Sequence, residues 1–357
     1  MVQNPWRRTS LGSREIVIMR ITSIGLLLSS LAFASHGFAD AVKIIFDTDM
    51  GNDVDDALAL AMLHSLQNRG ESELLAVTLT KDHQQVAPYI DAINTFYGRP
   101  DIPIGVTDSG VTPEVSRFTG LTQETVNGEL VFPHDLNEVD QAPSAVELLR
   151  EVLVSQPDGS VVIVQVGFST NLARLLQTGG DRISSLSGRE LVAQKVKHIS
   201  IMAGAFERIG DNIHLEFNVA RDIPAAQRLA DDWPTPVIWS GFEVGLAIRY
   251  PAASIEHDFA YSTRHPIPES YQLYIPTPHE RPTWDLTSVL WAVRPDRDYF
   301  QLSPEGRVQV EEDGETVFRE EEGGLHRYLI ASELDVVRAQ EVLAALVSEP
   351  PNTSAKP

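Results

Sequence analysis

The 357-residue chain contains no cysteine. Disulfide bonds, thiolate metal sites and cysteine nucleophiles are therefore excluded. Without such crosslinks the fold has to be held together by its hydrophobic core, and 43% of the residues are hydrophobic. The sequence accordingly predicts a protein that is stabilised by packing alone.

Basic residues are also scarce. Lysine and arginine number 28, against 50 aspartate and glutamate residues, which gives a formal net charge of −22. Such a charge argues against nucleic acid and anionic membranes as partners, because both carry negative charge themselves.

Long hydrophobic runs are missing, apart from one near the amino terminus. Residues 21–34 form an apolar run that follows four arginines, and Gly37-Phe38-Ala39 then offers small residues at positions −3 and −1 of a cleavage site. This pattern is typical of a secretory signal peptide at residues 1–39, with Met1 or Met19 as its start. The run is too short for a membrane anchor, which needs about 18 apolar residues.

Export by the Sec route is therefore predicted, and the mature protein is expected to be periplasmic or secreted, with no membrane contact after cleavage. Twin-arginine export is disfavoured because the apolar run begins far downstream of Arg7-Arg8. Removal of the leader leaves 24 basic and 49 acidic residues, a net charge of −25.

The mature chain alternates short β-rich runs with longer amphipathic ones. Expected strands cover residues 74–80, 102–106, 161–166, 196–202 and 237–240, and expected helices cover 86–97, 144–155, 170–176 and 224–231. This order predicts an α/β fold with an open, mostly parallel, doubly wound (Rossmann-like) sheet and helices on both faces. A C-terminal β-hairpin at 306–318 and a helix at 334–346 follow, and residues 107–142 form a long excursion. We expect a single domain at residues 40–349 and a disordered tail at 350–357.

The most informative stretch is an acidic turn at the end of the first expected strand. Five aspartates follow the apolar residues 44–46 within ten positions, and an Ala/Leu-rich helix begins directly afterwards; they are Asp47, Asp49, Asp53, Asp55 and Asp56. Carboxylates this close repel one another, and a hard cation such as Ca²⁺ or Mg²⁺ would remove the conflict. One carboxylate could then take a proton from water. Asp53 or Asp55 could instead serve at the N-cap or in the first turn of the helix.

Three further stretches place polar groups after expected strands or at a helix start. The carbonyl of Val166 could reach a metal, and Glu216 and Asn218 share a side if their segment is extended. A carboxylate beside an amide suits sugar hydroxyls. Asp285 lies in the sequence RPTWD at the start of an expected helix, and it could simply cap that helix.

Taken together, these motifs resemble the inosine-uridine preferring nucleoside hydrolase family. The turn DTDMGNDVDDAL is similar to that family's DxDxGxDD, with two more residues between the glycine and the double aspartate, as in exported bacterial members. The resemblance continues in order through VGFSTNLARLL, MAGAF, EFNVARDIPAA and TWDLTSVLWAV, over about residues 43–300.

The resemblance implies the nucleoside hydrolase fold and an enzyme, a nucleoside N-ribohydrolase. Such an enzyme cleaves the N-glycosidic bond of purine or pyrimidine nucleosides to ribose and free base, using a Ca²⁺-bound water that an aspartate activates. It implies Ca²⁺ ligands at Asp49, Asp56, the Val166 carbonyl and Asp285. The base would be Asp49 or Asp55, with Asp49 preferred. The implied substrate-binding residues are Asp55, Asp82, Asn212, Glu216, Asn218 and Trp284.

The group that activates the leaving base is left open. Some family members place a histidine directly before the last aspartate, and here that position is Trp284. His83, His134 and His279 are candidate proton donors, and stacking of the base on an aromatic ring is another route. A non-catalytic periplasmic nucleoside or sugar binder on the same fold is the alternative function, and a haloacid-dehalogenase-type phosphatase is disfavoured because Gly51 replaces its usual residue. Both a monomer and a homo-oligomer remain open.

Overall fold

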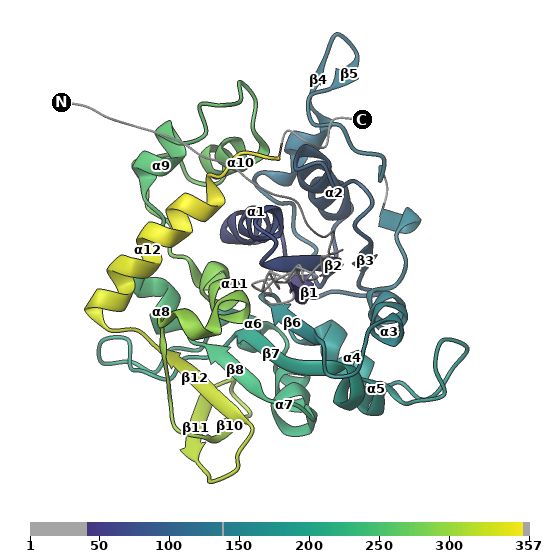
Figure 1. The fold of residues 1–357 in the computed structure, drawn as a ribbon, viewed down its shortest axis with the longest axis vertical. Helices are drawn as coiled ribbons and strands as arrows, with labels where there is room; N and C mark the ends of the chain where they lie inside the picture. The colour runs from purple at the N-terminus through teal and green to yellow at the C-terminus, as the bar shows by residue number, and fades with distance from the viewer. Residues whose placement is uncertain (1–40, 138, 353–357) are drawn as a thin grey trace, which may run out of the picture. The chain divides into compact units, whose positions relative to one another are not determined.

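A ten-stranded sheet forms the centre of the part of the chain that the computed structural model describes, residues 41–137 and 139–352 (Figure 1). Its strand order is β11-β10-β12-β8-β7-β6-β1-β2-β3, and β9 pairs with β12. Seven neighbouring strands are parallel: β12 (His326–Ile330), β8 (Val237–Ser240), β7 (Val196–Met202), β6 (Val161–Gln165), β1 (Val42–Thr48), β2 (Ser72–Leu79) and β3 (Ile104–Val106). The predicted α/β fold with a mostly parallel sheet is confirmed.

The central strands are buried on both faces because their side chains alternate between two hydrophobic cores. In β1, Ile44 and Phe46 belong to one core and Ile45 to the other. In β6, Val162 and Val164 belong to the first core, as the two-residue period of a strand requires. A strand that is covered on both faces reads as a continuous apolar run, which is why β6 was recognisable in the sequence.

The first core lies under α1 (Asp55–Asn68), α2 (Val86–Phe96), α8 (Phe242–Ala247), α9 (Ala252–His257), α10 (Pro266–Tyr274), α11 (Trp284–Val293) and α12 (Glu333–Val347). Helices α1, α11 and α12 contact one another, and α11 also contacts β6, β7 and β8. Figure 1 shows α1, α11 and α12 together on this face of the sheet.

The second core lies under α3 (Ala145–Ser155), α4 (Thr170–Gln177), α5 (Gly188–Lys195) and α7 (Ile223–Asp232), on the opposite face. The short α6 (Phe217–Arg221) contributes Val219 to it. Helices therefore cover both faces of the sheet, as predicted from the alternation of strands and helices.

The chain order reverses between β1 and β6. From β1 the chain runs outward to β2 and β3, and it then returns to β6 on the other side of β1 and continues to β7 and β8. In open α/β sheets this switch point leaves a crevice at the carboxyl ends of the strands, where ligands bind. The acidic turn follows β1 at this edge, so the topology gives it a central position.

Residues 107–142 hold little regular structure, as expected. They contain the 3₁₀ helices Thr119–Gln123 and Val139–Gln141 and a small hairpin of β4 (Thr125–Val126) and β5 (Glu129–Leu130).

The C-terminal part contains the predicted hairpin and helix, with an addition. Strands β10 (Gly306–Val310) and β11 (Thr316–Glu320) form the hairpin, and α12 closes the described chain. The addition is β12, which pairs in parallel with β8 and joins the hairpin to the main sheet, while β9 (Gln301–Leu302) pairs with it in antiparallel fashion. The sequence pattern indicated neither of these two strands, and it did not indicate α5, α6, α8, α9 or α10.

The predicted leader lies outside the described residues, as do residues 353–357 of the predicted tail. Among the described residues, no helix has the length and apolar character that crossing a membrane would require.

Gly167 allows β6 and the turn after β1 to approach closely. A Cβ atom at this position would lie 2.4 Å from the backbone nitrogen of Asp49 and 2.7 Å from the carbonyl carbon of Thr48. Backbone cannot move aside as a flexible side chain can, so only glycine fits here.

We therefore predict that Gly167→Ala lowers the free energy of unfolding by roughly 1–3 kcal/mol, the usual cost of overpacking. Gly179→Ala is the matched control, because nothing lies within 4 Å of its Cβ position, and its effect should stay within about 0.5 kcal/mol. Urea denaturation measures both variants. Equal stability of the two would show that the contact at Gly167 does not constrain the turn.

Candidate active site

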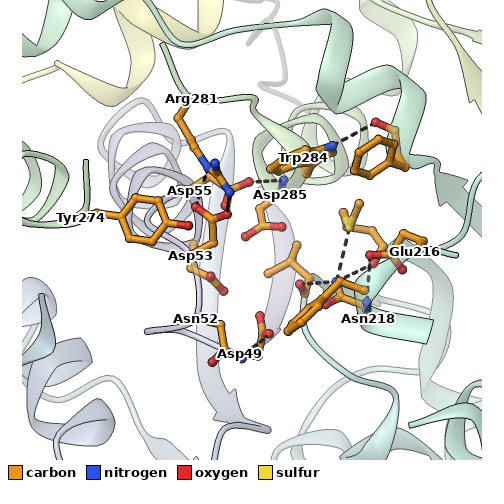
Figure 2. Close-up of a pocket in the computed structure, with 15 residues that line it drawn as sticks. Asp49, Asn52, Asp53, Asp55, Glu216, Asn218, Tyr274, Arg281, Trp284 and Asp285 are labelled. Atoms are coloured by element: carbon orange, nitrogen blue, oxygen red, sulfur yellow. Dashed lines mark hydrogen bonds and ion pairs between the residues drawn. The ribbon is translucent and has the colours of Figure 1, made fainter. Parts of the chain in front are cut away.

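A pocket of about 300 Å³ opens at the carboxyl edge of the sheet, around the acidic turn (Figure 2). The carboxylates lie on its floor, and aromatic side chains and one arginine line the rest. The lining residues are Asp49, Asn52, Asp53, Asp55, Asp56, Val166, Met202, Glu216, Phe217, Asn218, Phe242, Tyr274, Arg281, Trp284 and Asp285.

Three aspartates meet where two helices begin. Asp55 and Asp56 occupy the first turn of α1, and Asp285 occupies the first turn of α11, which packs against α1. Carboxylate oxygens of the three lie within 4.8 Å of one another. The backbone N–H of Asp285 donates to Oδ2 of Asp55 at 3.2 Å, which ties the two helix starts together. This is a geometry in which a cation could bind.

The electrostatics of this trio are unfavourable without a cation. Burial raises the pKa of Asp55, Asp56 and Asp285 well above the usual range, and the negative charges of neighbouring aspartates raise all three further. Asp56 accepts a hydrogen bond from the Thr48 hydroxyl through Oδ1, but its buried Oδ2 has no partner among the described residues. A buried carboxylate oxygen without a hydrogen-bond partner is consistent with a site that binds a ligand.

Asp49 lies directly after β1 and is held by an amide. The side-chain nitrogen of Asn52 donates to Oδ2 of Asp49 at 2.7 Å, and the Asn52 carbonyl accepts from the buried Lys81 ammonium at 2.7 Å. Because ammonium only donates, Lys81 fixes which end of the amide faces Asp49. Burial raises the pKa of Asp49 to about 6, while the Asn52 hydrogen bond and the Lys81 charge oppose that rise.

Sequence reasoning overlooked Asn52 and Lys81. Asn52 follows the turn glycine directly, so its position inside the motif was an available signal. Lys81 follows β2, the neighbour of β1, and could have been noticed as a lysine at the same sheet edge.

The remaining aspartates of the turn have other roles. Asp47 is not among the lining residues, and its Oδ1 accepts from Thr78 at 2.5 Å and from Asn171 at 2.9 Å. Asp53 pairs with Arg281 through two hydrogen bonds and also accepts from the backbone of Val54 at 2.6 Å. The N-cap of α1 is Val54, and Asp55 lies in the first turn of the helix, the other position considered for it.

Glu216 and Asn218 both line the pocket, although their segment is not extended. Glu216 is the N-cap of α6, and its carboxylate accepts from the backbone N–H groups of Asn218, Val219 and Gly204 at 2.8–3.1 Å. Burial raises the pKa of Glu216 to about 7, against these three hydrogen bonds. The Asn218 amide donates to the Val166 carbonyl at 2.9 Å. Residues two positions apart thus reach the same pocket here because they lie at the start of a helix.

Two residues expected to bind the sugar do not line this pocket. Asp82 is exposed, its Oδ2 accepts from the backbone N–H of Gly110 at 3.3 Å, and it borders a separate hollow. Asn212 is exposed in a loop, where its backbone pairs with Ile209. Each residue lies in a loop, and the order of motifs along the chain does not predict how a loop directs its side chains.

The histidines considered for the leaving base do not line the pocket either. His83 and His134 border the same separate hollow as Asp82. His279 is not among the lining residues, and its backbone carbonyl accepts from the Tyr271 hydroxyl at 2.8 Å.

Planar side chains form the wall above the carboxylates. Trp284 stacks on Phe242, with ring centroids 5.3 Å apart and an interplanar angle of 27°, and its indole N–H donates to the Phe242 carbonyl at 2.9 Å. The guanidinium of Arg281 lies 5.0 Å from the Trp284 ring centroid and 5.1 Å from that of Tyr274 (Figure 2). Sequence reasoning predicted only Trp284 of this wall.

Comparison with known proteins identifies a family. The family model described as inosine-uridine preferring nucleoside hydrolase matches residues 44–341. The inosine-uridine preferring nucleoside hydrolase of Crithidia fasciculata is 26% identical over 215 residues, which cover 59% of this chain and 62% of that protein. An uncharacterized protein of Schizosaccharomyces pombe is 27% identical over 271 residues, 71% of this chain and 81% of that protein.

Solved structures share the fold. The purine-preferring ribonucleoside hydrolase from Gardnerella vaginalis superposes with a TM-score of 0.66 at 21% identity, covering 86% of this chain and 98% of that one. An inosine-guanosine nucleoside hydrolase gives a TM-score of 0.64 at 22% identity, covering 85% and 98%. The described sheet and its helices therefore have the nucleoside hydrolase fold.

The crowded carboxylates should cost stability when no cation is bound. We predict that Asp285→Asn raises the free energy of unfolding at pH 8 in EDTA by roughly 0.5–2 kcal/mol, because it removes one of the repelling charges without changing shape. Urea denaturation is the measurement.

Asp181→Asn provides the contrast, since Asp181 accepts two hydrogen bonds from the buried Arg150, at 2.8 and 3.0 Å. That variant should be less stable than the wild type. A loss of stability in Asp285→Asn as well would contradict the account of repulsion.

Proposed function

The chain belongs to the inosine-uridine preferring nucleoside hydrolase family, and from this premise we propose that it hydrolyses the N-glycosidic bond of ribonucleosides to ribose and free base. The main support for the proposal is the set of side chains on the floor of the pocket. Three buried aspartates converge there, with Asp49, Glu216 and Asn218 around them. Hydroxyl-binding carboxylates and amides together suit a pentose.

The residues fit a divalent cation. Carboxylate oxygens of Asp55, Asp56 and Asp285 lie within 4.8 Å of one another, and the buried Oδ2 of Asp56 lacks a partner among the described residues. Oxygen-only donors suit a hard cation, and we propose Ca²⁺, with Asp49, Asp56, Asp285 and the Val166 carbonyl as its ligands. The ion would supply a positive charge that orients two ribose hydroxyls and acidifies a water molecule.

Asp49 is the proposed general base. Its Oδ2 is engaged by Asn52, and its raised pKa makes it a better proton acceptor than an ordinary aspartate. It would take one proton from the water that attacks C1′ of the ribose. Carboxylates nearby stabilise the oxocarbenium-like transition state that such cleavage passes through.

Asp55, Glu216 and Asn218 are the proposed ribose contacts. Glu216 is held rigidly by three backbone N–H groups, so little ordering is needed when a sugar hydroxyl binds. The Asn218 nitrogen already donates to the carbonyls of Val166 and Met202, at 2.9 and 3.1 Å, which leaves its oxygen for the substrate.

The base of the nucleoside would lie against the wall of Phe242, Tyr274 and Trp284, because heteroaromatic bases stack on aromatic rings. Export to the periplasm or exterior is part of the proposal and rests on the leader pattern of residues 1–39. A non-catalytic binder has less support, since the proposed base and all the carboxylates of the proposed cation site line the pocket.

The role of Asp49 predicts a specific loss. Asp49→Asn should lower kcat for ribose release from inosine and uridine by about 10²–10⁴-fold, the contribution of a general base. Binding of a nucleoside should persist, as measured by calorimetry. The matched control is Asp82→Asn, a carboxylate outside the pocket that should keep wild-type activity. Full activity in Asp49→Asn would refute the assignment.

The proposed cation predicts a thermal shift that does not depend on activity. Added CaCl₂ should raise the melting temperature of chelator-treated protein, equivalent to about 2.7 kcal/mol at a concentration 100 times Kd. The shift should be larger at pH 8 than at pH 5, because the raised pKa values of Asp56 and Asp285 mean that protons must leave before the ion binds.

The same chelator should stop ribose release, and added CaCl₂ should restore it. Absence of a thermal shift, together with ribose release that continues in chelator, would show that the pocket needs no cation.

A further inference from the structure

Arg281 is a cation in a pocket otherwise lined by acidic, amide and apolar side chains. Its Nε donates to Oδ1 of Asp53 at 2.9 Å, and its Nη2 donates to Oδ2 of the same carboxylate. The third nitrogen, Nη1, forms no hydrogen bond within the described residues. One edge of the guanidinium is thus held by Asp53, and the other donors are left for a ligand.

The surroundings place this cation beside the wall and not on the floor. Figure 2 shows the guanidinium between Tyr274 and Trp284, above Asp53 and Asp55. The ring centroids lie 5.1 and 5.0 Å from its central carbon, within the range of cation–π attraction. Arg281 therefore lies next to the rings on which the nucleobase would stack.

Asp53 explains why the arginine stays there. The charge of Arg281 also acts on Asp55, so an unrestrained guanidinium would be drawn toward the floor carboxylates. The two-point contact with Asp53 is the stronger geometry and fixes the plane of the group. Asp53 itself lies in the stretch that makes this acidic turn two residues longer than DxDxGxDD.

We propose that Arg281 is a catalytic residue that stabilises the departing nucleobase, an inference that rests on the proposed function. When the bond between C1′ and the base nitrogen breaks, its electron pair moves onto the base. The water oxygen bonds to C1′, one water proton goes to Asp49, and the base anion takes a proton from solvent on release. Arg281 donates hydrogen bonds to the base while this negative charge develops.

Arg281 acts by charge and hydrogen bonding, and not as an acid. Its proton is not lost under ordinary conditions, because the pKa of a guanidinium is above 12. No histidine is among the lining residues in the described chain, and the imidazole of His214 stacks on the lining Phe242, with ring centroids 3.7 Å apart. Preorganised donors aimed at developing charge are among the strongest catalytic devices known in enzymes.

The test compares substrates that differ in how much help their leaving group needs. Inosine and uridine release poor leaving groups, whereas 4-nitrophenyl β-D-ribofuranoside releases a stable phenolate unaided. Arg281→Met should lower kcat for the two nucleosides by about 10²–10³-fold, the usual effect of removing one such donor. It should leave kcat for the nitrophenyl riboside close to the wild-type value.

Arg281→Lys keeps a cation without the fork and should recover part of the nucleoside rate. If Arg281→Met does not fold, Arg281→Lys replaces it in the comparison. It should then show a smaller loss of kcat that is again confined to the nucleosides. Arg294→Gln is the matched control for loss of a two-point ion pair, because Arg294 binds Glu71 at 2.7 and 2.6 Å and does not line the pocket. It should leave the ratio of the two substrate rates unchanged.

Two results would overturn the inference. An equal loss on nucleosides and the nitrophenyl riboside would mean that Arg281 supports the ribose site or the fold. Unchanged nucleoside rates would mean that it has no part in the reaction. A wild-type protein that cleaves none of the three substrates would instead refute the proposed function, and the role of Arg281 would be refuted with it.

Discussion

Mutual repulsion of buried carboxylates is the constraint on which the rest of this structure depends. Two unit charges 4 Å apart at an effective dielectric constant of 20 repel by about 4 kcal/mol, a large share of a domain's stability. The protein nevertheless brings Asp55, Asp56 and Asp285 together in a pocket where each is at most 5% exposed. Two hydrophobic cores, one on each face of the sheet, stabilise the fold enough to tolerate this arrangement. Strain of that kind is expected at a functional site and is relieved when a ligand of opposite charge binds.

The network around the floor shows how the fold holds the acids in place. Thr48 and Asn52 each donate a hydrogen bond to one carboxylate, and the backbone of Asp285 donates to Asp55. These contacts fix orientation without supplying a compensating charge. Lys81 donates to Asn52 and to the Thr112 carbonyl, and Arg281 is held by Asp53, so neither cation donates a hydrogen bond to Asp49, Asp55, Asp56 or Asp285. The carboxylates on the pocket floor are therefore left to bind a cation from solvent, and Arg281 stays beside the aromatic wall.

Much of this was predictable from sequence because the signals are local. The run at Val161–Gln165 reads as a strand buried on both faces, and the acidic turn follows a strand directly, so both the sheet and the position of the turn could be inferred. Contacts between distant segments could not. Asp53 and Arg281 are 228 positions apart, and they meet next to the starts of α1 and α11, two helices that pack against each other. Asp82 and Asn212 were assigned by motif order, yet loop conformation decides where such side chains point. Strand β12 was missed because its five residues carry no clear alternation.

The most direct test of the account is a crystal structure of the protein grown with calcium and a non-cleavable nucleoside analogue. The account predicts one ion at about 2.3–2.6 Å from oxygens of Asp56 and Asp285, as calcium requires, with two ribose hydroxyls beside it. The base would lie on the Trp284 side of the pocket. An empty turn whose aspartates point outward into solvent, with the analogue bound elsewhere or not at all, would contradict the central claim.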